Sequence, residues 1–165
     1  MLEFFDVDID YADFLRRYEK KVPYIKYAQK DKFVCGVALC INDCDYFVPV
    51  SSNKNKTQTD IEIVDKYGVV LSTLRFGYMF PAPIGILTRK DIAAIRVTDY
   101  AYADLLQKEY EFCRKNELII RQKAEKVYRI GCNKNHFLNR QCCDFRLLEE
   151  KRKEYFNILM DDAGI

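Results

Sequence analysis

The chain contains no tryptophan and a single histidine, His136. Catalysis by two histidines is therefore excluded within one chain, and any triad built on histidine has to use His136. The surrounding run CNKNHFL carries no nucleophile-elbow or other triad signature. We interpret His136 as a loop or capping residue.

Glycine-rich nucleotide-binding signatures and paired-histidine metal motifs are also missing. Asp6, Asp8 and Asp10 alternate in DVDID, but the glycine and distal glutamate of a calcium loop do not follow, so we interpret them as an exposed acidic edge. The seven cysteines include no CxxC pair, which favours reduced buried thiols over a zinc cage. We expect no metal site and no cofactor.

No run approaches the ~18 apolar residues of a membrane span, and the acidic start MLEFFDVDIDY is not typical of a signal peptide. We expect a cytoplasmic protein with no membrane partner. Apolar residues make up 49% of the 165, without repeats or linkers, which predicts one globular domain over 1–165. The net charge of +2 requires that any nucleic-acid site arise from local segregation of charge.

The first half of the chain has the pattern of strands, and the second half has the pattern of helices. Apolar runs predict a hairpin of 33–41 with 46–50 around the turn NDCD, and a second strand pair of 61–64 with 68–74. The period of the apolar residues predicts a short helix over 10–20, one long helix from 99 to 129 that Asp99 or Thr98 caps and Gly131 ends, and a last helix over 143–159. This order indicates an α+β domain on a compact antiparallel sheet or barrel, with long C-terminal helices.

The segment 45–60, DYFVPVSSNKNKTQTD, places hydroxyls and cations together at the end of a predicted strand. Ser51 and Ser52 end the strand, Lys54 and Lys56 follow, and no acidic residue occurs between them and Asp60. Serine and lysine commonly contact phosphates, and a lysine can stabilise the charge that develops on a phosphorane. The alternative is a plain solvated hairpin loop.

Aromatic residues interleave with lysines in KKVPYIKYAQKDK, where Tyr24 and Tyr27 lie among Lys21, Lys30 and Lys32. Bases of single-stranded RNA stack on aromatic rings while cations hold the backbone, so this pattern suits RNA. The alternative is that the tyrosines are amphipathic residues at the boundary between core and solvent.

These segments together resemble the ToxN/AbiQ family of type III toxin–antitoxin toxins, and the CptN branch in particular. KKVPYIKYAQKDKFVCGVALCIND is followed by DYFVPVSSNK, and the tail DFRLLEEKRKEY resembles the family's last helix. The positions that match the family's pattern are Tyr11 in DYADFL, Lys21-Val22-Pro23, Tyr27, Lys32 and the corner from Pro49 to Lys54. Asn53 stands where the family usually has proline, which predicts a looser corner. STLRFGYMFPAP departs from the family's pattern, so the resemblance assigns no role to Arg75 or Tyr78.

The resemblance implies a small SH3-like barrel, like that of the Kid/MazF toxins, with added helices. It implies a metal-independent endoribonuclease of single-stranded RNA, often A-rich, that leaves 2′,3′-cyclic phosphate and 5′-hydroxyl ends. The implied partners are substrate mRNA and a repeated pseudoknot antitoxin RNA, which the toxin cuts from a precursor and which joins it in a ring-like assembly; a role in phage defence goes with this, and DNA is not an expected partner.

On this hypothesis Lys54, helped by the hydroxyls of Ser51 and Ser52, stabilises charge, and Lys32 holds a neighbouring phosphate. Tyr11 and Tyr27 position or stack the flanking nucleotide, and either one assists proton transfer. The residues expected to bind RNA are Tyr11, Lys21, Tyr27, Lys30, Lys32, Lys54 and Lys56. Two alternatives stay open: an RNA-binding module without cleavage, which the missing acid/base pair favours, and a toxin of the same fold that acts on a topoisomerase-like protein.

Overall fold

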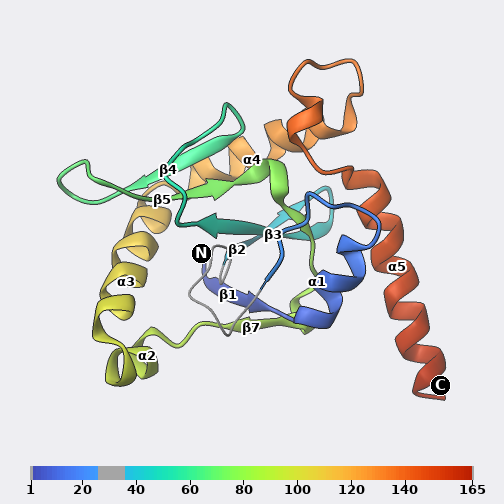
Figure 1. Cartoon of the computed structure of the whole chain (residues 1–165), viewed down its shortest axis with the longest axis horizontal. Coiled ribbons are helices and arrows are strands. Elements are labelled where there is room, and N and C mark those ends of the chain that lie inside the picture. The colour runs from blue at the N-terminus through green and yellow to red at the C-terminus, as the bar shows by residue number, and fades with distance from the viewer. Residues whose placement is uncertain (1, 26–35, 165) are drawn as a thin grey trace.

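The computed structural model describes residues 2–25 and 36–164. Within these residues it is an α+β structure with one seven-stranded sheet in the order β4-β5-β3-β2-β1-β7, and with β6 paired to β3 (Figure 1). All its strand pairs are antiparallel. The strands are β1 Phe4–Val7, β2 Gly36–Ile41, β3 Cys44–Ser51, β4 Asp60–Val64, β5 Val70–Arg75, β6 Phe80–Pro81 and β7 Leu87–Arg89.

The predicted hairpin of β2 and β3 is confirmed over the residues that the structure describes. Asn42 and Asp43 form its turn, and both have positive φ (48° and 59°), which two-residue hairpin turns of type I′ require. Asparagine and aspartate tolerate this left-handed conformation better than most residues. The second predicted pair is confirmed as β4 and β5, and Gly68 supplies the positive φ in their turn.

One edge of β3 pairs with two strands in succession, and the join between them bulges outward. Val50 and Ser51 pair with Leu74 and Thr73 of β5, whereas Phe47 pairs with Phe80 of β6. The segment from β5 to β6, which pairs with β3, therefore contains more residues than β3 does over the same length of sheet. The surplus forms the 3₁₀ turn η1, Phe76–Tyr78, which leaves the sheet plane beside the end of β3.

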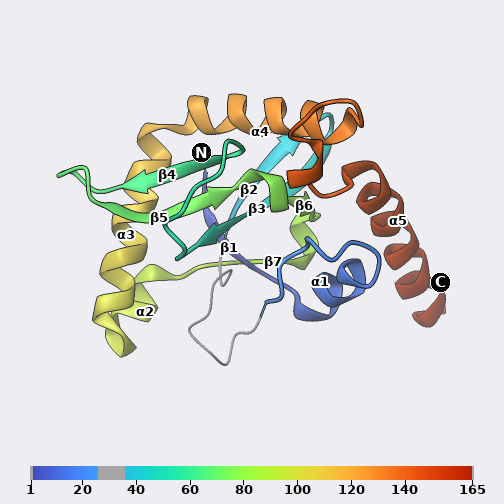
Figure 2. The same cartoon turned by 45° about the horizontal axis from the view of Figure 1, so that its top comes forward.

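The helices lie around the ends and one side of the sheet. α4 crosses above it, α3 lies at the left in Figure 1, α5 lies at the right, and α1 lies between the sheet and α5 (Figures 1 and 2). The helices are α1 Ile9–Arg16, α2 Ile92–Thr98, α3 Tyr100–Lys115, α4 Glu117–Cys132 and α5 Phe145–Asp162, and two further 3₁₀ turns are η2 Ile84–Ile86 and η3 Asn139–Gln141.

The prediction of one helix from 99 to 129 is wrong, because the chain turns at Asn116 into two helices. The Asn116 backbone leaves the helical region (φ −110°, ψ 18°), and its side-chain Nδ2 donates to Phe112 O at 2.9 Å, which ends α3. The apolar stripe continues in phase across this break, so periodicity alone does not reveal it. The start at Asp99 is confirmed, since its carboxylate accepts the N–H of Tyr102 at 3.1 Å.

The sequence predicts that Gly131 ends the helix, but Gly131 lies within the last turn of α4. A Cβ at this position would overlap the ring of Phe145, which is fully buried at the start of α5. The glycine is therefore required for the close packing of α4 on α5. Gly131 is needed for this packing, and not to end the helix as its position near the helix end predicted.

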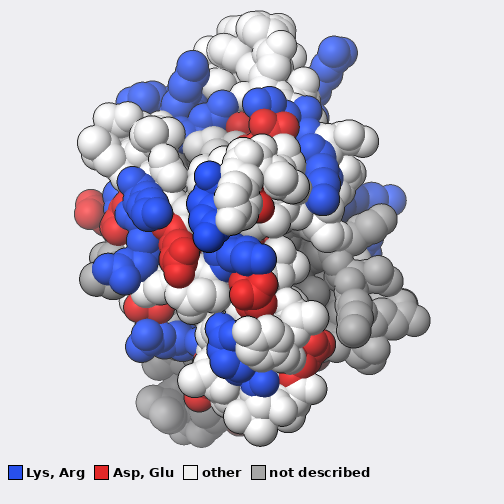
Figure 3. Space-filling model, turned by 90° about the vertical axis from the view of Figure 1, so that its left-hand side faces the viewer, with Lys and Arg blue, Asp and Glu red and all other residues white. Residues whose placement is uncertain are grey.

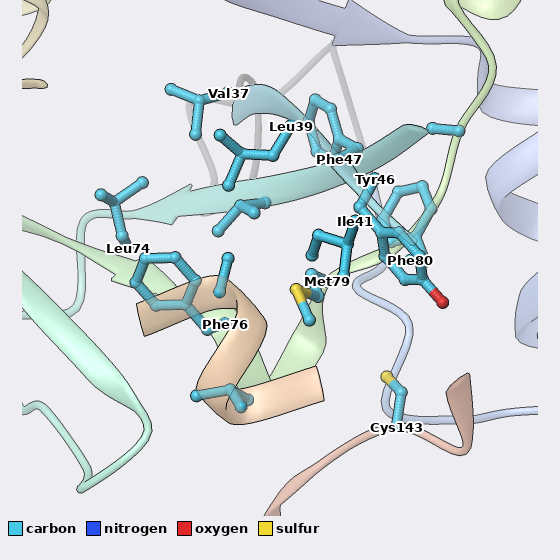
Figure 4. Close-up of a cluster of buried hydrophobic side chains, with 14 of the residues drawn as sticks. Val37, Leu39, Ile41, Tyr46, Phe47, Leu74, Phe76, Met79, Phe80 and Cys143 are labelled. Carbon is cyan, nitrogen blue, oxygen red and sulfur yellow. The ribbon is translucent and has the colours of Figure 1, made fainter. Parts of the chain in front are cut away.

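The core lies between the sheet and the helices. Val37, Leu39 and Ile41 alternate along β2, so their side chains share one face, and they pack with Leu74 and Phe76 in the cluster of Figure 4. A partly buried carboxylate joins three elements beside this core. Glu149 Oε1 of α5 accepts hydrogen bonds from the hydroxyls of Tyr46 in β3 and Tyr128 in α4, each at 2.8 Å.

Other sequence predictions can be compared with these elements. Asp8 caps α1 by accepting the N–H of Tyr11 at 2.9 Å, so it is a helix cap as well as part of an acidic edge. The cysteines among the described residues are free thiols, and most of them are buried. No helix in the described part of the chain is long and apolar enough to cross a membrane.

Candidate active site

The corner after β3, residues 51–54, is shaped by its own polar side chains. Ser51 Oγ accepts the N–H of Asn53 at 3.2 Å, and Asn53 Oδ1 accepts the N–H of Asn55 at 3.0 Å. These are local turns of the kind that serine and asparagine stabilise. Asn53, which stands where the family usually has proline, thus uses its side-chain amide to hold the turn that follows.

Strand β5 holds this corner from the side. The carbonyl oxygen of Asn53 accepts two side-chain hydrogen bonds, from Thr73 Oγ1 at 2.8 Å and from Arg75 Nη2 at 3.0 Å. Both donors are buried residues of the neighbouring strand. The backbone just before Lys54 is therefore fixed by the sheet, while the Lys54 side chain itself lies in solvent.

Arg75 is anchored by a buried ion pair with Asp60. Its Nη1 lies 2.6 Å from Asp60 Oδ2, and the two side chains are only 7% and 3% exposed. Asp60 Oδ2 also accepts the N–H and the hydroxyl of Thr57, at 2.8 and 3.0 Å. A buried pair whose remaining lone pairs are hydrogen-bonded is rigid, and removal of one partner leaves an uncompensated charge. This network joins the loop before β4 to the corner after β3.

Helix α4 contributes cations to the same loop. Lys123 Nζ donates to the carbonyl oxygen of Gln58 at 2.7 Å, and partial burial together with Lys126 and Lys56 lowers the pKa of Lys123. Lys126 and Lys56 therefore lie near enough to Lys123 to affect its pKa, and Asp60 opposes them. Lys54 has no hydrogen-bond or ion-pair partner among the described residues, so its charge is available to an anion.

The structure separates the two serines that the sequence treats alike. Ser51 is 1% exposed and its hydroxyl accepts a hydrogen bond within the turn, so its burial does not fit the expectation that this hydroxyl helps Lys54 to stabilise charge. Ser52 and Lys54 are exposed. Lys56 is exposed too, but its Nζ lies 3.1 Å from Glu62 Oε2, which compensates part of its charge.

Tyr11 does not fit its expected role of stacking against a nucleotide. Its side chain is fully buried, its hydroxyl donates to Pro81 O at 2.5 Å, and its ring packs edge-on against Tyr155 with centroids 5.0 Å apart. Burial also raises its pKa. Tyr11 is therefore a core residue that joins α1 to β6 and α5. Tyr27, Lys30 and Lys32 lie outside the described residues, so their expected roles stay predictions.

A cavity of about 320 Å³ opens beside the corner, where three segments meet. Arg75 lies on the border, because one side of its guanidinium binds the corner and the residue also lines the cavity. The loop before β4, the bulge η1 and the turn η3 supply its walls. The lining residues are Thr57, Thr59, Asp60, Arg75, Gly77, Tyr78, Arg140 and Gln141.

A second hollow of about 630 Å³ adjoins the first through Arg140, which lines both. Lys21, Lys134 and Arg146 bring further positive charge to it. Two of its acids are engaged by the main chain: Glu19 Oε2 accepts the N–H of Asp144 at 2.9 Å, and Asp144 Oδ1 accepts the N–H of Leu147 at 3.1 Å. Lys21 lies 3.8 Å from Glu19, so its charge is partly compensated.

His136 lines neither hollow. Its Nδ1 accepts the N–H of Leu138 at 3.1 Å, and its ring stacks on Phe137 with centroids 4.9 Å apart. The interpretation of His136 as a loop histidine is confirmed. Within residues 2–25 and 36–164, no group of three or more histidine, cysteine, aspartate or glutamate side chains is placed to hold a metal ion.

The side of the molecule that carries α3 and the β4–β5 turn has a different charge pattern. Figure 3 shows lysine and arginine side chains interspersed with aspartate and glutamate on this face. Lys108 and Asp104 of α3, for example, form an ion pair at 2.7 Å. Opposite charges side by side cancel at a distance, so this face attracts a polyanion less than Lys54 and the lysines of α4 do.

Sequence reasoning did not find Arg75, Asp60 or Thr73. One feature of the sequence could have indicated Arg75, because this arginine ends an otherwise neutral apolar strand. A charged side chain that is buried in a strand requires a partner of opposite charge. Asp60 is the acid nearest to the cationic loop in sequence. The pairing between them was not deducible, because it depends on the register of β4 against β5, which places Asp60 opposite Arg75.

The fold and site define a small α+β protein with a cationic, hydroxyl-bearing corner suited to phosphate. Residues 3–153 match the family model described as toxin ToxN of type III toxin–antitoxin systems, so the chain belongs to this family. It is 34% identical to Endoribonuclease ToxN of Bacillus thuringiensis subsp. kurstaki, over 93% of this chain and 84% of that protein. It is 28% identical to Endoribonuclease AbiQ of Lactococcus lactis subsp. lactis, over 93% and 89%.

Two solved structures have the same fold. A type III toxin described as selectively inhibited by a non-coding RNA pseudoknot superimposes with a TM-score of 0.85 at 32% identity, covering 93% of this chain and 97% of that one. AbiQ, described as a lactococcal anti-phage endoribonuclease, superimposes with a TM-score of 0.76 at 25% identity, covering 95% and 99%. These comparisons confirm the family resemblance and the mixed α+β fold with its antiparallel sheet.

Proposed function

We propose that this chain is the endoribonuclease toxin of a type III toxin–antitoxin system. Its family and the names of its relatives support this function. The observation that carries the proposal is the corner itself, where an exposed Lys54 without a partner among the described residues follows a backbone fixed by Thr73 and Arg75. A cation carried on a fixed backbone next to an exposed hydroxyl suits charge stabilisation during phosphoryl transfer.

The proposed reaction uses the RNA's own 2′-hydroxyl as nucleophile. A bond forms between the 2′-oxygen and phosphorus, the bond from phosphorus to the 5′-oxygen breaks, and the proton lost from the 2′-hydroxyl is balanced by one gained at the 5′-oxygen. The products are a 2′,3′-cyclic phosphate and a 5′-hydroxyl. The protein has to align the attack and stabilise the negative charge on phosphorus.

We assign charge stabilisation to Lys54 and a phosphate contact to Ser52, because both side chains are exposed at the corner. Ser51 supports them through the turn, and Lys56 contributes to the field around them. Lys32 and Tyr27 keep their predicted roles beside the scissile phosphate. His136 takes no part, so acceleration comes from positioning and electrostatics, and no metal is required.

The partners we propose are substrate mRNA and a pseudoknot antitoxin RNA that occupies the same site, in a ring-like assembly of toxin and RNA. The relative inhibited by an RNA pseudoknot supports the antitoxin, and the anti-phage relative supports a role in phage defence. Lys21 in the second hollow is positioned to meet RNA backbone beyond the cavity. We further propose that the sheet corresponds to the SH3-like barrel of the Kid/MazF toxins.

The test compares Lys54→Ala with Lys66→Ala. Lys66 lies in the β4–β5 turn, at the opposite end of this strand pair from Asp60 and Arg75, so its removal changes net charge equally without touching the corner. We expect K54A to slow cutting of single-stranded RNA on the order of 10²–10³-fold, and K66A to cut like the wild type, with both variants melting normally. Equal rates for K54A and wild type would place the site elsewhere.

The mechanism has its own test. An RNA with a single 2′-deoxy nucleotide at the mapped cut should resist the wild-type protein at that position, because the nucleophile is absent. Cutting of this RNA at an unchanged rate would overturn attack by the 2′-hydroxyl. A protein that binds RNA tightly but yields no 5′-hydroxyl ends would establish the alternative of an RNA-binding module.

A further inference from the structure

The segment between α4 and α5, the orange loop at the top of Figure 1, exposes an aromatic pair that the proposed reaction does not use. Phe137 is 71% exposed. One face of its ring is covered by the ring of His136, with centroids 4.9 Å apart and planes inclined by 17°, which is a favourable stacked geometry. The other face of the Phe137 ring is therefore open to solvent.

Hydrogen bonds hold the loop that carries this pair. His136 Nδ1 accepts the N–H of Leu138 at 3.1 Å, and the side chain of Leu138 is buried. Asn139 Nδ2 donates to the carbonyl oxygens of Ile130 and Gly131 at 3.1 and 2.9 Å, so the loop is fastened to the last turn of α4. A ring on a fixed loop loses little conformational freedom when a flat ligand stacks on it. The exposed ring is therefore preorganised for such a ligand.

The same segment carries positive charge without compensating acids. No acidic residue occurs in the sequence between Glu125 and Asp144. The exposed cations of this segment, which form no ion pair among the described residues, are Lys126, Arg129, Lys134 and Arg140. Lys134 and Arg140 flank Phe137 in the sequence and line the second hollow. Arg140 also lines the cavity beside the corner, so a strand that crosses this loop can continue to the corner.

We infer that Phe137, backed by His136, is a stacking platform for one unpaired base of the single-stranded RNA substrate, outside the cut site. Bases stack on aromatic rings with little regard to sequence, and proteins that bind single strands place cations beside such rings to hold the backbone. Lys134 and Arg140 can contact the phosphates that neighbour this base. This inference rests on the proposed function.

A protein partner fits this surface less well than RNA does. A protein interface requires a contiguous apolar patch, whereas the exposed neighbours of Phe137 in the loop are polar or cationic: Asn133, Lys134, Asn135 and Arg140. One flat ring among cations matches one base on an anionic backbone. The platform touches neither the scissile phosphate nor the corner, so its contribution is to binding and not to the chemical step.

The first experiment compares Phe137→Ala with Tyr67→Ala in steady-state cutting of single-stranded RNA. Tyr67, in the turn between β4 and β5, is a matched control because it is 77% exposed and Lys66 Nζ lies 5.0 Å from its ring centroid. Stacking outside the cut site is equally strong before and during the reaction, so F137A should raise KM by about 5–150-fold and leave kcat unchanged. Y67A and the conservative F137Y should cut like the wild type, and all three variants should melt normally because the rings are exposed. A folded F137A with an unchanged KM would refute the platform.

A second arm measures binding alone and locates the stacked base. The RNA carries a 2′-deoxy nucleotide at the mapped cut, so that it binds without being cut, and its other nucleotides are replaced one at a time by a ribose that lacks a base. We expect one position at which the missing base weakens binding to the wild type but not to F137A, because a contact that is already absent cannot be lost twice. Exchange of one natural base for another at this position should change the affinity little.

The outcomes separate the platform from the proposed function. Equal sensitivity of the wild type and F137A at every position would refute the platform, whether or not the protein cuts RNA. A protein that binds RNA but never cuts it would refute the proposed function, and the same series of RNAs without the 2′-deoxy nucleotide would then test the platform. A wild type that does not bind single-stranded RNA would refute both.

Discussion

Replacement of Arg75 by methionine removes the buried cation that joins Asp60 to the Lys54 corner, and we expect it to destabilise the fold by about 3 kcal/mol. Loss of one partner of a buried pair typically costs about 3–5 kcal/mol, and the low exposure of both side chains places this pair in that class. The lower end applies, because Asp60 keeps two hydrogen bonds from Thr57. For a chain of this length, this corresponds to a fall of about 6–12 °C in melting temperature.

The matched control is Lys56→Met, which breaks the ion pair with Glu62 in the same loop. The Nζ–Oε2 distance is 3.1 Å, but the side chains are 53% and 32% exposed, so solvent screens the pair and its loss costs about 0–1 kcal/mol. Thermal melts of the two variants therefore compare a buried pair with an exposed one. The double variant with Asp60→Asn should regain part of the stability that R75M loses, since the uncompensated carboxylate is gone.

An RNA-cutting assay well below the melting temperature of R75M completes the test. Asn53 O then keeps only the hydrogen bond from Thr73, so the corner is less fixed and cutting should fall even though the protein is folded. The double variant should not recover cutting. The reasoning is refuted if R75M melts like K56M and cuts like the wild type, or if the second substitution restores no stability.

Three further outcomes are expected. Burial raises the pKa of Glu109 to about 7, so the folded protein favours its neutral form, and the free energy of unfolding falls as the pH rises toward and through 7. Glu109→Gln does not titrate, so its free energy of unfolding relative to wild type should rise by about 2 kcal/mol between pH 5.5 and 8. Urea titration measures this difference, and a difference that stays constant with pH would contradict the prediction. Gly131→Ala should lower the melting temperature, because overlap with Phe145 outweighs the ~1 kcal/mol that helix propensity offers; a rise would show that the ring can move. EDTA should leave the rate of RNA cutting unchanged. A loss of cutting in EDTA that added Mg²⁺ restores would refute the metal-independent mechanism.

Much of the fold was predictable because it depends on short-range signals. The turn of Asn42 and Asp43 between two apolar runs specifies the first hairpin, and Gly68 does the same for the second. Asp99 starts α3 through a hydrogen bond three residues along the chain. The break at Asn116 was not predictable from periodicity, because both helices present the same apolar stripe in phase and only their packing on different parts of the sheet separates them.

The candidate site also has features that the sequence predicts and features that it does not. The residue types of the corner, serine, asparagine and lysine, were visible in the sequence, and their exposure after a strand followed from the hairpin. The burial of Ser51 and of Tyr11 was not visible, because it depends on which face of an element meets the core.

The sequence by itself determined the family pattern, the hairpins, the helix starts and the cationic corner, since each arises from neighbours in the chain. Only the tertiary structure decided that Asp60 binds Arg75, that Asn53 is held by β5, and that η1 packs on η3 beside a cavity. These contacts join residues distant in sequence. Their geometry is fixed by strand register and by the turn η1 beside β3. At that point the segment from β5 to β6 has more residues than the part of β3 with which it pairs.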